Sequence, residues 1–144
     1  MFEMDKRLSG DTVTLGDFSL CRVLLMNDSR YPWLILVPRI ADASEVFELT
    51  DEQQQLLWQE TNTVGRVLNR EFNADKINIA TLGNVVKQLH MHIVVRMHTD
   101  EQWPAPVWGQ GAAKPYTEGA LVKIRERLQA ALAAHLLADN KVGL

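Results

Sequence analysis

Two histidines, His90 and His92, are separated by a single residue in the stretch KQLHMHIVVRM, residues 87–97. Successive side chains of a β-strand point to opposite faces, so a strand here would carry one apolar row and one polar row. The apolar row, typical of the core face of a sheet, contains Leu89, Met91, Ile93, Val95 and Met97. The opposite row contains Gln88, His90, His92, Val94 and Arg96. An amide, two imidazoles and a guanidinium on one face are unusual for a strand that is merely solvated.

Three interpretations of this polar row are open. The first is a solvated strand face with no further role. The second is a metal site, but zinc needs three or four ligands, no carboxylate lies near in the sequence, and His98 and His135 lie outside the strand. The third is covalent catalysis, in which a neutral imidazole attacks phosphorus while neighbouring donors hold the phosphate oxygens. Residues 88 and 92 would lie roughly 13 Å apart on one strand face, about the reach of a short phosphate chain.

The elements that would position this strand can be followed along the chain. The apolar runs 18–26 and 33–38, joined by the polar turn NDSRYP, predict an antiparallel hairpin. Thr50 and Gln53 form the pattern of a capping box, which marks the start of a helix. That helix has an apolar stripe at helical spacing, made by Leu57, Thr61, Val64, Leu68 and Phe72. The stretch KINIATL alternates as a further strand, and a turn with Gly83 leads from it to the histidines.

The chain ends in a long loop and a second helix. Residues 98–116 are rich in Pro, Gly and Trp, and such long irregular connections are usually functional or packed across the body of a protein. We expect Trp103 and Trp108 to fix this loop to the body. A helix at about 117–138 follows, with Leu121, Ile124, Leu128 and Leu132 on one stripe. Antiparallel strands with two long helices predict an α+β fold with the helices on one sheet face.

Length, charge and cysteine content narrow the function classes. A chain of 144 residues corresponds to about one domain, so we expect a single domain over 1–144. A net charge of −3 argues against a general binder of nucleic acid or of membrane surfaces. Cys21 is the only cysteine, which excludes an intrachain disulfide and a multi-cysteine zinc site. Charged residues interrupt the first ten positions, where a signal peptide would have an apolar core, so we expect a cytoplasmic protein.

The stretch GNVVKQLHMHIVV, residues 83–95, resembles the signature of the histidine triad (HIT) superfamily of nucleotide hydrolases and transferases. That signature is His-φ-His-φ-His-φ-φ, where φ is apolar. His90 and His92 match its second and third histidines, and Gln88 stands in place of the first. The hairpin LLMNDSRYPWLILVPR and the strand INIATLGN are also similar to the family's. The layout resembles a bacterial subgroup whose triad begins with glutamine. The resemblance implies an antiparallel sheet of about five strands with two main helices, and a homodimer.

The resemblance also implies a reaction. His90 would attack the α-phosphorus of a purine nucleotide and form a nucleotidyl-histidine, which water or another acceptor resolves. His92 would hold non-bridging phosphate oxygens. Gln88 would donate to the leaving oxygen, although an amide cannot deliver a proton at neutral pH. The implied substrates are dinucleoside polyphosphates and nucleoside phosphoramidates, with no metal or other cofactor. The alternative is a nucleotide-binding module with little turnover. Arg96 would either counter phosphate charge or lie exposed at the strand end.

Further positions match nucleotide-binding residues of the family. Asn27 matches the residue that meets the ribose, and Asn78 matches an amide that contacts or orients the phosphate. Asn84 stands where a glutamine is usual. Val85 stands where some members have Ser or Thr, so a hydroxyl contact to phosphate is missing. Trp33 stands where several members carry a histidine behind the catalytic one. We therefore do not expect a histidine relay behind His90.

Overall fold

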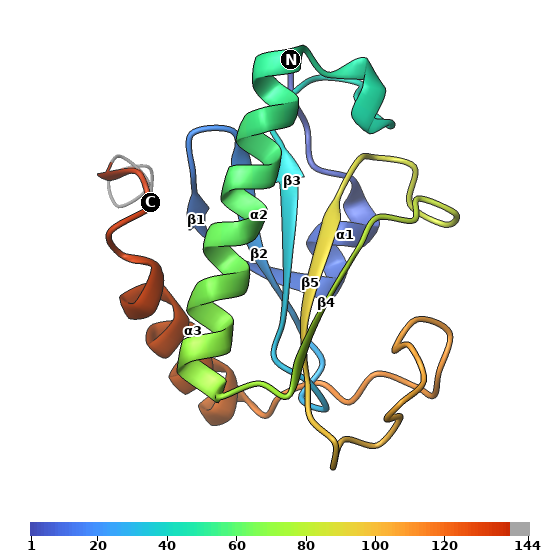
Figure 1. Ribbon diagram of the computed structural model, residues 1–144, viewed down its shortest axis with the longest axis vertical. Coiled ribbons are helices and arrows are strands. Elements are labelled where there is room, and N and C mark those ends of the chain that lie inside the picture. Colours follow the sequence, from blue (N-terminus) through green and yellow to red (C-terminus); the bar gives the residue numbers. More distant parts are fainter. Residues whose placement is uncertain (139–144) are drawn as a thin grey trace.

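A five-stranded antiparallel sheet, with strand order β1-β2-β3-β5-β4, forms the centre of the computed structural model, which describes residues 1–138 (Figure 1). The strands are β1 (Thr12–Asp17), β2 (Cys21–Met26), β3 (Trp33–Pro38), β4 (Lys76–Ala80) and β5 (Met91–Arg96). The helices are α1 (Lys6–Asp11), the 3-10 helix η1 (Val46–Glu48), α2 (Asp51–Phe72) and α3 (Glu118–Leu132). The predicted α+β fold is confirmed. The single domain predicted over 1–144 stays a prediction, since 139–144 lie outside the described residues.

The predicted hairpin corresponds to β2 and β3, which pair from Cys21 opposite Pro38 to Leu25 opposite Leu34. The sequence patterns did not predict α1 and β1, which precede this hairpin. β1 is an edge strand with an irregular register between Thr14 and Gly16, so only part of it is buried and its apolar alternation is weak. An edge strand needs less apolar sequence than a central one, which explains the omission.

Both long helices cover the same face of the sheet. α2 begins at the predicted capping box, where the Thr50 hydroxyl accepts from the Gln53 N–H and the Gln53 side chain accepts from the Thr50 N–H. Its buried stripe and Leu128 and Leu132 of α3 belong to one apolar core with Leu89, Met91, Ile93 and Val95. α3 is shorter than predicted and ends at Leu132. Within residues 1–138, the structure contains no helix of the length and apolarity needed to span a membrane.

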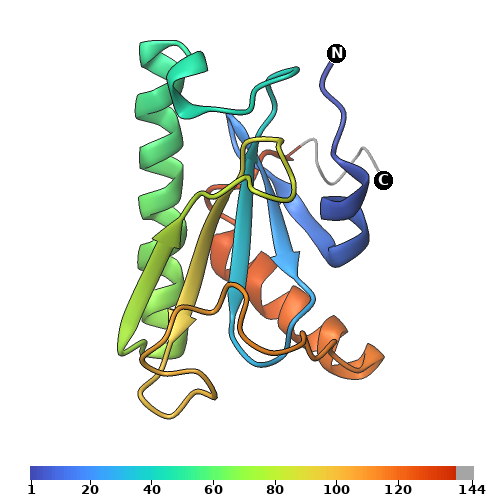
Figure 2. The same cartoon turned by 90° about the vertical axis from the view of Figure 1, so that its right-hand side faces the viewer.

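The opposite face of the sheet is covered by the N-terminal segment and by the loop after β5. A smaller apolar cluster lies there, and it consists of Leu8, Leu24, Tyr31, Trp33, Ile35, Val37, Val94 and Val107, with Phe2, Met4, Met26, Val86 and Trp108 packed against it. Figure 2 shows α2 and α1 on opposite sides of the sheet. This smaller cluster packs on the face of β5 from which the two histidines project. The segments that cover this face therefore surround the candidate site.

The predicted alternation of the histidine strand is confirmed from residue 89 onward, although β5 itself begins at Met91. Arg96 was expected either to counter phosphate charge or to lie exposed at the strand end, and it does neither. Its side chain is only 1% exposed, and it lies outside the cavity described below. Its guanidinium forms an ion pair with Asp100 at 2.8 Å and lies over the rings of Tyr31 and Trp103 at 5.5 and 5.6 Å. The partner carboxylate and the two aromatic faces make burial of this charge possible. Arg96 therefore anchors the loop that follows β5.

Candidate active site

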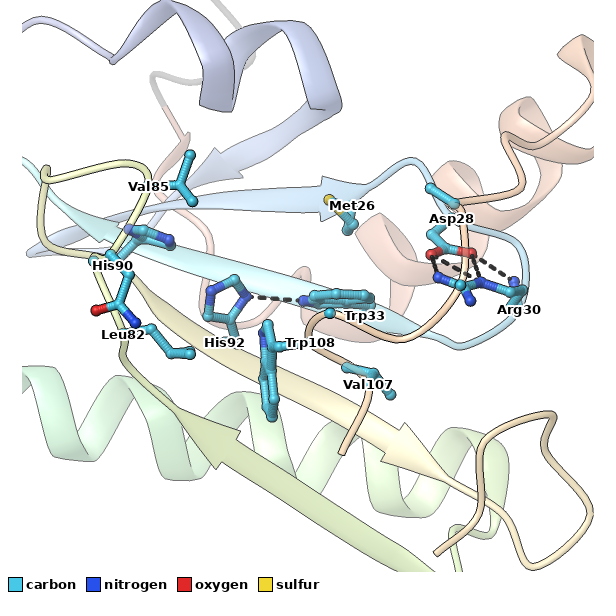
Figure 3. A pocket seen from close by; sticks show the side chains of 15 residues that line it. Met26, Asp28, Arg30, Trp33, Leu82, Val85, His90, His92, Val107 and Trp108 are labelled. Carbon is cyan, nitrogen blue, oxygen red and sulfur yellow. Dashed lines mark hydrogen bonds and ion pairs between the residues drawn. The ribbon is translucent and has the colours of Figure 1, made fainter. Parts of the chain in front are cut away.

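A cavity of about 340 Å³ opens on the α1 side of the sheet, between the β2–β3 turn, the start of β5 and the loop after it (Figure 3). Its walls are mostly apolar and aromatic. The lining residues are Met26, Asp28, Arg30, Trp33, Leu82, Gly83, Asn84, Val85, His90, His92, Val107, Trp108, Gly109, Gly111 and Ala113. Both histidines of the sequence motif are therefore brought to one cavity.

His90 is held in one orientation by the backbone just before β5. Its Nδ1 lies 2.6 Å from the backbone carbonyl oxygen of Gln88, and the residue is 6% exposed. A carbonyl can only accept, so Nδ1 carries the proton and Nε2 keeps its lone pair when the imidazole is neutral. The Thr81 hydroxyl donates to the His90 carbonyl at 2.7 Å, which fixes the backbone as well. His90 thus has the tautomer that a nitrogen nucleophile requires.

His92 is buried to the same extent as His90, with 7% of the residue exposed. Its Nδ1 accepts a hydrogen bond from the indole Nε1 of Trp33 at 3.0 Å, and its ring centroid lies 4.8 Å from that of His90. Burial, with a smaller effect from nearby His90, lowers the pKa of His92 to about 3. His92 is therefore neutral at physiological pH and can act only through a neutral N–H or a lone pair.

Gln88 does not line the cavity, because its side chain turns to the N-terminal segment. The side-chain oxygen accepts from the backbone N–H of Asp5 at 2.8 Å, and the side-chain nitrogen donates to the carbonyl of Glu3 at 2.8 Å. The contact of Gln88 with His90 is instead made by its backbone carbonyl. Gln88 therefore contacts His90 through its backbone, while its side-chain amide is occupied by the N-terminal segment.

The four predicted nucleotide-binding residues divide into two pairs. Asn84 and Val85 line the cavity in the turn before β5, where Val85 is 76% exposed. Asn27 and Asn78 do not line it. The side-chain oxygen of Asn27 accepts from the Tyr116 N–H at 2.9 Å, and that of Asn78 accepts from Arg96 at 3.0 Å. Both asparagines hold the segment 96–116 against the sheet.

Asp28 and Arg30 line the cavity but were not singled out from the sequence, where they read as ordinary turn residues. Their side chains form an ion pair at 2.7 Å, with exposures of 1% and 5%. Burial by itself would raise the pKa of Asp28, but hydrogen bonds from the Arg30 side chain and from backbone N–H groups hold that pKa below its ordinary value. Arg30 also donates to the carbonyl of Gln110 at 2.9 Å. The pair therefore fixes the loop that closes one end of the cavity.

The two tryptophans of the loop have different positions. Trp103 packs on the body of the protein against Arg96 and His98, as predicted. Trp108 enters the cavity wall, with its ring centroid 5.4 Å from that of His92 and 6.1 Å from that of Trp33. Figure 3 shows the rings of His90, His92, Trp108 and Trp33 along the cavity, with the Asp28–Arg30 pair beyond Trp33. A ring on the loop thus completes an aromatic wall beside the histidines.

Within residues 1–138, no group of three or more His, Cys, Asp and Glu side chains is arranged to hold a metal ion. The other two histidines lie apart from the cavity. His98 lies 3.6 Å from the Asp75 carboxylate, and the His135 ring lies against Phe18.

The fold and the paired histidines define a class of α+β proteins in which two imidazoles project from a β-sheet into a cavity. Comparison with known proteins identifies the family. Residues 7–99 match the profile of the HIT domain, and the chain belongs to this family. None of the curated proteins compared with the chain matches it.

Solved structures support the same assignment over nearly the whole chain. A histidine triad protein from Marinobacter aquaeolei VT8 is 45% identical, with 94% of this chain and 98% of that chain covered and a TM-score of 0.91. A histidine triad protein from Sinorhizobium meliloti 1021 is 46% identical with the same coverage and a TM-score of 0.86. The diadenosine triphosphate hydrolase of Plasmodium falciparum shares the fold, at 15% identity, coverage of 93% and 82%, and a TM-score of 0.65.

Proposed function

We propose that this protein is a nucleotide hydrolase or transferase that cleaves a phosphoanhydride or phosphoramidate at the α-phosphorus of a purine nucleotide. The observation that supports this most is the 2.6 Å contact between His90 Nδ1 and the Gln88 carbonyl in the cavity wall. It leaves the Nε2 lone pair of a neutral imidazole available for attack.

The reaction proceeds in two displacements. The Nε2 lone pair of His90 forms a P–N bond while the bond from phosphorus to the leaving group breaks, and the leaving group departs with the bonding pair. The Gln88 carbonyl stabilises the positive charge that develops on the imidazole through the Nδ1–H. Water then attacks phosphorus, the P–N bond breaks, and the nucleoside monophosphate and one proton are released. Another acceptor in place of water gives transfer instead of hydrolysis.

The leaving group is one that needs little help from the first triad position. The Gln88 amide is bonded to Glu3 and Asp5, and an amide cannot deliver a proton at neutral pH. General acid catalysis typically contributes about 10² to 10⁴ in rate, so substrates whose leaving group departs without protonation are favoured. We therefore infer that Gln88 acts through its backbone carbonyl, which orients the His90 ring.

The charge of the cavity favours a substrate of low negative charge. Among the described residues that line it, Arg30 is the only permanent cation, and Asp28 neutralises it. His92 contributes no charge because its pKa is lowered to about 3. A long polyphosphate would bring several negative charges beside an apolar wall without counter-charges, which is costly. A phosphoramidate, or the α-phosphate of a short anhydride with its further charges in solvent, fits better.

The remaining predicted residues have supporting roles in this proposal. Asn84 and Val85 line the cavity where a phosphate would lie, and their backbone N–H groups are suitable donors. Asn27 and Asn78 act indirectly, since they hold the loop and Arg96. We further propose a homodimeric, cytoplasmic protein with a nucleotide as its small-molecule partner.

The proposal is tested by mixing the purified protein, with EDTA present, with an adenosine phosphoramidate and separately with a diadenosine polyphosphate. AMP release is followed by chromatography. We expect release that is lost in His90→Ala, faster release from the phosphoramidate, and an adenylyl adduct on His90 by mass spectrometry under rapid quenching. His98→Ala, which removes an exposed imidazole outside the cavity, is the matched control and keeps activity.

A second candidate function is a nucleotide-binding module with little turnover. The occupied Gln88 amide favours it, because the first triad position then offers no group to the leaving oxygen. Titration calorimetry with AMP separates the two functions. Binding of AMP without AMP release from either substrate would reject the hydrolase and support the module.

A further inference from the structure

Trp33 and His92 are diagonal neighbours on adjacent strands. In the register of β3 and β5, Trp33 lies opposite Val94 and Ile35 lies opposite His92, so both rings project from the same face of the sheet. The indole nitrogen of Trp33 lies 3.0 Å from His92 Nδ1, and the two residues are 5% and 7% exposed. The contact is thus built into the ladder and shielded from water.

An indole N–H can donate a hydrogen bond but cannot accept one. His92 Nδ1 must therefore be the acceptor, with its lone pair directed at the indole. A proton on Nδ1 would place the His92 N–H against the Trp33 N–H. The buried indole donor would then have no acceptor, which is unfavourable. A neutral imidazole carries one proton, so that proton is on Nε2.

We propose that Trp33 is a positioning residue that holds His92 in the single tautomer with its proton on Nε2, so that His92 offers the substrate a fixed hydrogen-bond donor. The first half of this proposal concerns the ring alone, and only the contact with substrate rests on the proposed function. The tautomer is opposite to that of His90, whose Nδ1 faces a carbonyl. Two imidazoles one residue apart are thereby given different tasks, with His90 supplying a lone pair and His92 an N–H.

Among the described residues, the hydrogen bond from Trp33 has no competitor at His92 Nδ1. The ring of His90 lies 4.8 Å away and that of Trp108 5.4 Å away, centroid to centroid. The indole nitrogen of Trp108 is buried and has no hydrogen-bond partner within the described residues, so it does not fix the His92 ring. Because burial and His90 lower the pKa of His92 to about 3, the ring is neutral at physiological pH. The Nε2–H donor is then present at that pH.

Nitrogen-15 NMR of the histidine rings tests the tautomer directly. In the wild-type protein we expect His92 Nε2 to show the shift of a protonated nitrogen and Nδ1 that of an unprotonated one, with no exchange average. The reverse assignment, or an average of the two, would overturn the proposal without any variant. This measurement needs no substrate.

Trp33→Phe removes the N–H donor and keeps an aromatic ring, and Trp33→His restores a ring N–H. We expect a mixture of His92 tautomers in Trp33→Phe, with kcat reduced by roughly tenfold and a smaller change in KM, as for one lost hydrogen bond. Trp33→His should recover part of both. Trp108→Phe is the matched control for the tautomer, because it removes the other indole N–H beside His92 and should leave the NMR signals of a single tautomer.

The outcomes separate this proposal from the proposed function. A single Nε2–H tautomer in Trp33→Phe would show that the indole does not set it and would overturn the proposal. Mixed tautomers with unchanged kcat would reject the positioning role. Mixed tautomers in a protein whose wild type releases no AMP would support the tautomer control by Trp33 and reject the hydrolase function.

Discussion

The backbone N–H of Asp5 donates to the side-chain oxygen of Gln88 at 2.8 Å, across 83 positions of sequence. The side-chain nitrogen of Gln88 returns a hydrogen bond to the carbonyl of Glu3. The backbone carbonyl of the same glutamine accepts from His90. Gln88 therefore connects the N-terminal segment, which packs beside the cavity with Phe2 and Met4, to the imidazole proposed as the nucleophile.

This connection predicts that Gln88→Ala weakens both the N-terminal segment and the reaction. Two hydrogen bonds are lost, each worth about 0.5–1.5 kcal/mol, so amide hydrogen exchange at residues 3–8 should become faster. Because the carbonyl of residue 88 then loses its support, kcat should fall by roughly tenfold. Lys87→Ala, at the exposed neighbouring position, is the control and should change neither quantity. Unchanged exchange at 3–8 in Gln88→Ala would contradict the connection.

The second prediction concerns the pH dependence of stability. The pKa of His92 is about 3 in the folded protein and 6.5 in its ordinary state. Between these values the unfolded chain binds a proton that the folded protein does not, so stability falls as pH decreases from 6.5 towards 3. One proton gives a slope of at most about 1.4 kcal/mol per pH unit.

The His92 contribution is measured by comparison with His92→Asn. Urea unfolding at several pH values from 7 to 4 should give a free energy of unfolding that decreases more steeply in the wild type than in the variant. His98→Asn, which removes an exposed imidazole, is the matched control. Parallel curves for wild type and His92→Asn would show that His92 is not kept neutral by the fold.

The sequence predicted those features that depend on local patterns. Thr50 and Gln53 specify the start of α2 because the capping box uses only residues three apart. The apolar alternation from Leu89 to Val95 places both histidines on the correct face because the period of a strand is two. These signals are independent of the rest of the chain.

The details of the site depend on contacts that no local pattern contains. Gln88 is on the predicted face, but its partners are more than eighty positions away, so its amide leaves the cavity. Asn27 resembles a ribose-binding residue, yet its side chain meets Tyr116, and the next residue, Asp28, lines the cavity. The chain turns directly after β2, where the Asp28 N–H donates to the Met26 carbonyl, and strand alternation ends there. A shift by one residue decides which side chain enters the site.

The third prediction concerns the buried Asp28–Arg30 pair. Asp28→Asn removes the charge that neutralises a guanidinium whose side chain is only 5% exposed. Breaking a buried pair typically costs about 3–5 kcal/mol, and chemical denaturation should show a loss of this size. The loop should also exchange faster near Gln110, which Arg30 contacts. Glu101→Gln, which weakens the exposed Lys114–Glu101 pair on the same loop, is the control and should cost about 1 kcal/mol or less. Equal losses in both variants would contradict this ranking.

The fourth prediction concerns assembly along β4. Among the described residues, β4 lies at the sheet edge and pairs with β5 alone, so its other edge offers backbone N–H and C=O groups to a second copy. Ile79 on this strand is 39% exposed. We expect the wild type to sediment as a dimer and Ile79→Lys, which places a charge at the edge, to sediment as a monomer. Val122→Lys, at an exposed position of α3, is the matched control and should remain dimeric. A dimer that persists in Ile79→Lys would exclude β4 as the contact, and a monomeric wild type would reject the homodimer.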